Sequence, residues 1–180
     1  MSKTALKKEL QTMTQEQLVQ TILDAYSARA EIKEYFEFFL NPDAEALFEK
    51  FRTAAVRELD RVKRGVYSKA RISVLRKQIK LFDSFQPGAE WSVRFRLFIV
   101  AYAVTGQPGV ILPLTLMQGV ADIMCRALSL ADATEHTDTA MGEVQRIIAD
   151  ETGGSRYFRR LLGEALEDYL AGLAPALRRP

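Results

Sequence analysis

Apolar residues recur at helical spacing in nearly every segment of this 180-residue chain. Leu18, Ile22 and Tyr26 fall on one face of a helix, and Phe95 and Phe98 do so farther along the chain. Spacings of three and four residues match the turn of an α-helix, whereas a strand would alternate every second residue. We therefore predict an all-α protein of about eight or nine helices.

Short turns separate the predicted helices. Asn41-Pro42 ends one of them, and Gly65 stands at the C-terminal end of a long helix predicted over residues 44–64. Because the connections are short, consecutive helices are expected to pack as antiparallel hairpins, either in a compact bundle or in a short curved stack of helix pairs. No long linker interrupts the chain, so residues 1–180 are predicted to form a single helical domain.

An uncharged stretch of 25 residues, 97–121, has the length of a membrane span. Gly106, Pro108 and Pro113 interrupt it, so we expect two buried helices joined by a turn. The first fifteen residues lack the apolar run of a secretory signal, and the single Cys125 cannot form an internal disulfide. The sequence therefore predicts a cytoplasmic protein without a membrane partner.

Basic residues are concentrated in one part of a chain whose net charge is only +2. Nine basic and two acidic residues lie between positions 57 and 80. On two predicted helices the basic residues recur opposite the apolar stripe, so the two helices are expected to present one positive surface. The candidate binding residues on this surface are Lys50, Arg57, Arg61, Arg64, Lys69, Arg76, Lys77 and Lys80.

Three interpretations of this surface stay open. A charged face opposite an apolar stripe is typical of any solvated amphipathic helix. The surface also suits a protein partner or a second copy of the chain, because residues 81–154 hold four basic and nine acidic residues. It suits the phosphates of nucleic acid as well, although we expect no exposed aromatic residues among the basic ones to stack on bases. We predict a protein-interaction module, with nucleic-acid binding as the alternative.

A weaker candidate anion site precedes the last predicted helix. Gly154, Ser155, Arg156 and Arg159 would place backbone amides and guanidinium groups at a helix N-terminus, which favours phosphate or carboxylate. The same segment has a purely structural explanation, since Gly153 ends one helix and Ser155 caps the next. The spacing of a phosphate-binding P-loop is missing.

No combination of residues predicts catalysis, a cofactor or a metal site. Cys125 and His136 are eleven positions apart, which separates them by roughly 16 Å along a helix. One histidine and one cysteine cannot complete an ordinary zinc site. The adjacent carboxylates Asp150-Glu151 and Glu167-Asp168 point in different directions on a helix. We therefore predict no catalytic residue, cofactor or metal ligand, and favour a protein without enzymatic activity.

Three segments are LKKEL at 6–10, KEYFEFFLNPD at 33–43 and KRGVYSKARISVLRKQIKLF at 63–82. Together these segments resemble an uncharacterised family of bacterial helical proteins. The resemblance extends over most of the chain and implies a small cytoplasmic bacterial protein with a helical fold. It implies no activity, because none is established for the family. Relatives carry a glycine-aromatic-histidine segment near the C-terminus, and the matching GGSRYFRRLL at 153–162 has no histidine.

Overall fold

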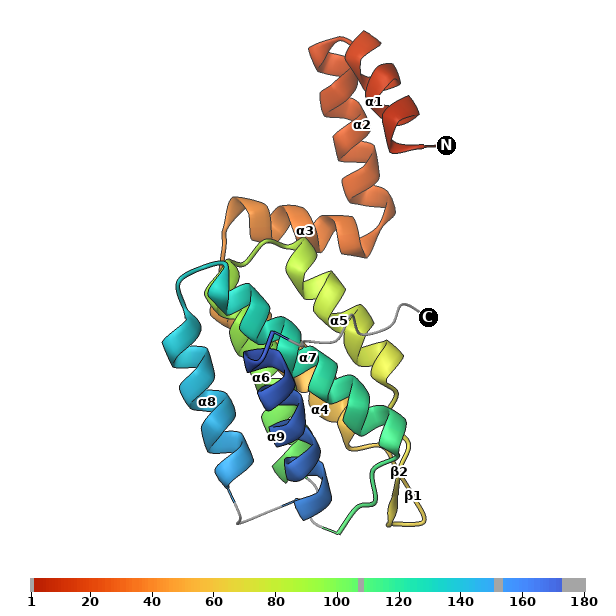
Figure 1. Ribbon diagram of the computed structural model, residues 1–180. Coiled ribbons are helices and arrows are strands. Elements are labelled where there is room, and N and C mark those ends of the chain that lie inside the picture. The colour runs from red at the N-terminus through yellow and green to blue at the C-terminus, as the bar shows by residue number, and fades with distance from the viewer. Residues whose placement is uncertain (1, 107–108, 151–153, 173–180) are drawn as a thin grey trace. The chain divides into compact units, whose positions relative to one another are not determined.

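The computed structural model describes residues 2–106, 109–150 and 154–172. Within these ranges the chain forms nine α-helices and one two-stranded sheet, which confirms the predicted all-α class (Figure 1). The structure divides into two compact units, Met1–Asp43 and Ala44–Pro180. Compactness does not decide whether the two units fold together, so the single domain stays a prediction.

The first unit consists of three helices, α1 (Lys3–Thr12), α2 (Gln15–Ala28) and α3 (Ala30–Leu40). A capping box begins α2, because Gln17 N donates to Thr14 Oγ1 at 3.3 Å and Thr14 N donates to Gln17 Oε1 at 2.9 Å. Helices α2 and α3 meet through their aromatic side chains. None of residues 2–43 is buried, so this unit has no core of its own.

The second unit is a compact helical bundle, the first of the two arrangements expected from the short turns. Helices α6 and α7 pack on each other more extensively than any other pair. The six helices of the described part of this unit are α4 (Ala44–Leu59), α5 (Ile72–Ser84), α6 (Ala89–Thr105), α7 (Leu114–Asp132), α8 (Thr137–Ala149) and α9 (Arg156–Leu170).

Phenylalanines from three helices form one side of the core of the bundle. The ring centroids of Phe82 on α5 and Phe95 on α6 lie 4.8 Å apart, and Phe51 on α4 lies 5.4 Å from Phe82. Tilted and edge-to-face arrangements of this kind are the favourable ones for aromatic pairs. Burial of these rings holds α4, α5 and α6 together.

The uncharged stretch 97–121 is divided between α6 and α7, as the sequence predicts. In the described residues, α7 is the one helix long and apolar enough to cross a membrane. However, 67% of its apolar window is buried inside the protein. This degree of burial is typical of a core helix, since a span would turn apolar side chains outward to lipid.

The main departure from the predicted fold follows α4. The helix predicted over 44–64 ends at Leu59, and a hairpin of β1 (Val62–Lys63) and β2 (Tyr67–Ser68) comes next. Arg64 and Gly65 turn this hairpin with φ values of 55° and 71°. Positive φ at two successive turn residues is the mark of a tight hairpin turn, so Gly65 does not end a helix.

Two glycines inside helices offer a matched test of the packing between α5 and α7. A Cβ on Gly119 of α7 would lie 2.3 Å from Cγ1 of Ile72, whereas a Cβ on Gly142 of α8 would meet no atom within 4 Å. Alanine favours a helix over glycine by about 1 kcal/mol. We expect Gly142→Ala to raise the free energy of unfolding by up to about 1 kcal/mol. We expect Gly119→Ala to lower it by about 1–3 kcal/mol, because Ile72 or a helix must shift.

Urea denaturation followed by circular dichroism measures both variants. Equal stabilisation by the two alanines would contradict the close approach of Ile72 to α7.

Candidate functional site

The eight candidate basic residues do not form stripes on two helices. Lys50 and Arg57 lie on α4, and three others lie on α5, but the connection between the helices carries Arg61, Arg64 and Lys69. Because α4 ends before these three residues, their spacing has no helical meaning. The predicted two-helix stripe is therefore wrong, while a binding role for its residues stays a prediction.

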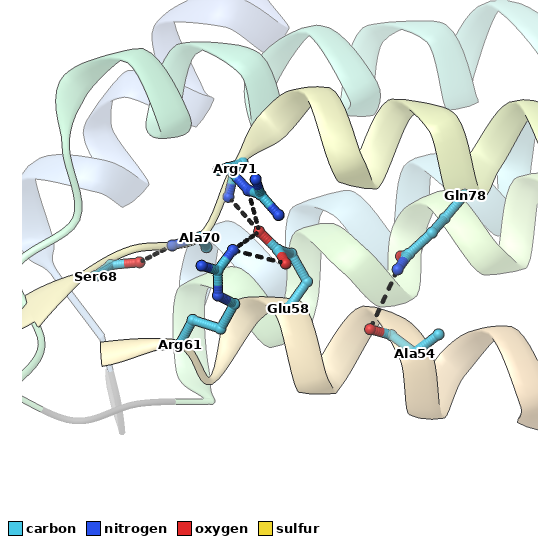
Figure 2. Close-up of polar contacts among 7 residues, drawn as sticks. All are labelled: Ala54, Glu58, Arg61, Ser68, Ala70, Arg71 and Gln78. Carbon is cyan, nitrogen blue, oxygen red and sulfur yellow. Dashed lines mark hydrogen bonds and ion pairs between the residues drawn. The ribbon is translucent and has the colours of Figure 1, made fainter. Parts of the chain in front are cut away.

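A buried carboxylate, Glu58 on the last turn of α4, holds two arginines (Figure 2). Its side chain is 8% exposed, and Arg61 Nη1 donates to Oε1 at 2.9 Å and to Oε2 at 3.1 Å. Arg71 donates its backbone N–H to Oε1 at 2.8 Å and its Nε to the same oxygen at 3.4 Å. A buried charge requires such donors. Glu58 thereby joins the end of α4 to the start of α5.

A second buried carboxylate, Asp122, lies in the middle of α7 with a side chain only 4% exposed. Arg76 Nη2 of α5 donates to Oδ2 at 2.9 Å, and Arg126 Nε donates to Oδ1 at 2.9 Å. The pair between Arg76 and Asp122 links α5 to α7. Arg61 and Arg76 thus each pair with a buried carboxylate.

The other six candidate basic side chains are exposed to solvent. Lys50 lies over the ring of Phe51, with Nζ 6.0 Å from the ring centroid. Five exposed candidates make no ion pair with any residue that the structure describes: Arg57, Arg64, Lys69, Lys77 and Lys80.

An aromatic residue is exposed among the basic residues, contrary to the sequence-based expectation. Tyr67 is 53% exposed and pairs with Lys63 across the hairpin, beside the turn at Arg64. The helix predicted over 44–64 hid this arrangement, because it assigned Lys63 and Arg64 to a helix. The hairpin therefore carries a basic and aromatic surface.

The residues of the weaker candidate anion site line two different cavities. Gly154 and Ser155 line a cavity of about 430 Å³, and Arg156 and Arg159 line a groove of about 590 Å³ along α9. Ser155 Oγ accepts from the N–H of Phe158 at 3.4 Å, as the structural explanation of a helix cap requires. Gly153 and Glu151 lie outside the described residues. The structure thus does not gather the four predicted residues around one anion.

The groove along α9 has mixed charge. Glu164 and Glu167 line it together with the arginines, and Arg160 Nε lies 3.3 Å from Glu164 Oε1. Carboxylates in the lining repel an anion as the arginines attract it. The mixed charge of the groove therefore gives it no preference for an anion.

The cavity of about 430 Å³ is mainly apolar. Its polar side includes Tyr102, whose hydroxyl donates to Asp60 Oδ1 at 2.8 Å. Burial, together with this carboxylate, raises the pKa of Tyr102 above its ordinary value. A Cβ on Gly154 would lie 1.8 Å from the carbonyl oxygen of Val104, so only glycine allows this close approach. The apolar walls are formed by Leu59, Ala103, Val104, Val110, Ile111, Leu112 and Met117.

Cys125 and His136 line neither of these two cavities. Cys125 is buried in α7, and burial, aided by the negative charges of Asp122 and Asp168, raises the pKa of its thiol. A raised pKa leaves little of the nucleophilic thiolate at neutral pH. His136 is the N-cap residue of α8. In the described ranges, no group of three or more His, Cys, Asp or Glu side chains is placed to hold a metal ion.

Sequence reasoning missed the two buried carboxylates, although one of them carries a readable signal. Asp122 is the first charge after the uncharged stretch 97–121 and has apolar neighbours on both sides. A lone carboxylate in such surroundings indicates a buried charge that needs a basic partner. Glu58 has no comparable signal, because it lies among other charged residues.

Two glutamates on α4 separate a buried ion pair from an exposed one. Glu58→Ala is expected to lower the free energy of unfolding by about 1–3 kcal/mol, because Arg71 N–H loses its buried acceptor. Glu49 pairs with Arg52 at the surface, with its side chain 51% exposed. Glu49→Ala is therefore expected to change stability by no more than about 0.5 kcal/mol. Urea denaturation of the two variants decides the matter, and similar small losses would contradict a structural role for Glu58.

Comparison with known proteins identifies a family. No curated protein and no solved structure matches the chain. A family of unknown function, DUF6155, matches residues 1–100, which contain the three segments that carry the resemblance seen in the sequence. The bacterial origin implied by that resemblance stays a prediction. Since the match covers more than half of the chain, the protein belongs to this family of unknown function.

Proposed function

We propose that the protein is a cytoplasmic protein-interaction module that acts without catalysis, through its first three helices. The observation that carries this proposal is a helical unit without buried residues but with many exposed apolar side chains. Exposed apolar surface of this extent is typical of a protein contact. The large apolar side chains that are exposed in this unit are Leu6, Met13, Val19, Ile22, Leu23, Phe39 and Leu40.

The apolar face of α2 is the part of this surface best suited to a partner. Val19, Ile22 and Leu23 are each about half exposed and fall on one face by helical spacing. Away from this face, Gln20 Nε2 donates to Asp24 Oδ1 at 2.8 Å. An amphipathic helix of this kind binds by placing its apolar face in a groove or against another helix. The partner is thus another protein or a second copy of this chain.

A charge placed on the apolar face of α2 tests this proposal. Leu23→Glu is expected to weaken retention of a protein partner by about tenfold or more, because a carboxylate would be buried in the contact. Gln20→Glu adds the same charge to a polar position with similar helix propensity, so its effect should stay below about twofold.

Two measurements make the comparison. Sedimentation of the purified protein reports self-association, and capture from nuclease-treated lysate reports another protein. Retention that survives Leu23→Glu, or that disappears with nuclease, would contradict this role for α2.

The hairpin supports a second candidate function, nucleic-acid association. Lys63, Arg64 and Lys69 are exposed beside Tyr67, which is itself half exposed. Basic side chains attract phosphates, and an exposed aromatic ring offers a stacking surface for a base. Basic residues beside an exposed aromatic ring indicate nucleic-acid binding more specifically than basic residues alone.

Charge reversal on the hairpin tests the second candidate. Arg64→Glu with Lys69→Glu is expected to weaken binding of a labelled single-stranded oligonucleotide by about tenfold or more and to reduce its salt dependence. Lys77→Glu with Lys80→Glu on α5 is the matched control and should cost less than about threefold. Arg61 and Arg76 are left unchanged because they pair with buried carboxylates. Absent or salt-insensitive binding in fluorescence anisotropy would eliminate this candidate.

A further inference from the structure

An isolated parallel bridge joins Ile111 to Tyr67, on the side of β2 away from β1. Ile111 N donates to Val66 O at 2.7 Å, and Ser68 N donates to Ile111 O at 3.0 Å. Ile111 therefore directs both of its backbone groups toward β2. In an extended chain the adjacent residues direct theirs to the opposite side.

The opposite edge of the backbone around Ile111 is unpaired among the described residues. No hydrogen bond joins the backbone of Val110 or Leu112 to another described residue. Pro113 follows directly as the N-cap residue of α7, so the edge is only a few residues long. An unpaired strand edge is a template for one more strand.

The same residues border the cavity of about 430 Å³. Val110 and Leu112 line it together with Leu59, Val104 and Met117 from three helices. Its volume lies within the range of specific binding pockets. Within the described part of the chain no charged side chain lines it, so it suits an uncharged apolar group. A strand edge and an apolar pocket therefore lie next to each other.

The charge around this edge selects among peptides. Lys63, Arg64 and Lys69 are exposed on the adjoining hairpin. Two strand spacings separate β1 from the edge, about 10 Å, which is comparable to the Debye length in physiological salt. Basic side chains at that distance attract an acidic segment and repel a basic one.

We propose that this edge binds an extended acidic segment of a partner protein by strand addition, with a bulky apolar side chain in the cavity. Backbone hydrogen bonds to Val110 and Leu112 would supply affinity, and the cavity would supply specificity. This site lies in the second unit and uses no residue of α2. Experiments can therefore contradict the strand-addition proposal while the proposed function of α2 holds, or contradict the function of α2 while strand addition holds.

Selection from a phage-displayed library of random short peptides tests the site. The enriched peptides are expected to share a bulky apolar residue flanked by Asp or Glu, and one of them is then synthesised with a fluorophore as the probe. Methylation of its backbone amides one at a time should weaken binding by about tenfold or more at every second residue and little in between, because only alternate N–H groups face the edge. No enrichment, or no alternation, would overturn the proposal.

Filling the cavity provides the matching test on the protein. Ala103→Leu places a larger side chain in the cavity and should weaken the probe by about tenfold or more. Ala149→Leu makes the same change at the exposed end of α8 and should alter affinity less than about twofold, as should Leu23→Glu. Circular dichroism establishes that each variant is folded. Unchanged affinity in folded Ala103→Leu would overturn the proposal, and the methylation series decides it independently should that variant not fold.

Discussion

The carboxylate of Glu58 is the interaction on which one end of the second unit depends. At 8% exposure it requires donors, and these come from Arg61 and Arg71 on the connection to α5. The chain must therefore return to the end of α4 after making the hairpin. That return fixes β2, and β2 in turn binds Ile111 of the segment before α7. The contacts of Glu58 thus bring together the two ends of the connection that carries the basic hairpin.

Basic residues in this protein have two roles that composition does not separate. Arg61, Arg71 and Arg76 neutralise buried carboxylates and stabilise the fold. The exposed hairpin residues, among them Arg64 and Lys69, remain accessible to a partner. The positive surface that a partner meets is therefore smaller than the sequence indicates, and part of it lies on a hairpin in place of the end of a helix.

The two proposed surfaces relate differently to the family match. Residues 1–100 contain the whole of the first unit and the hairpin. The cavity is formed mostly beyond residue 100, by the end of α6, the start of α7 and the start of α9. The match to DUF6155 thus covers the apolar face of α2 but only Leu59 of the cavity lining. A function shared by the family is therefore expected at α2 and the hairpin rather than at the cavity.

Local patterns in the sequence determined the helical class and the division of the uncharged stretch into α6 and α7. Each depends on residues within a few positions of one another, and helical spacing records which face is buried. Only the tertiary structure decided where α4 ends and which arginines are structural. Glu58 finds Arg71 thirteen residues away, and Asp122 finds Arg76 across forty-six. A buried charge selects its partner in space, and local periodicity carries no record of that choice.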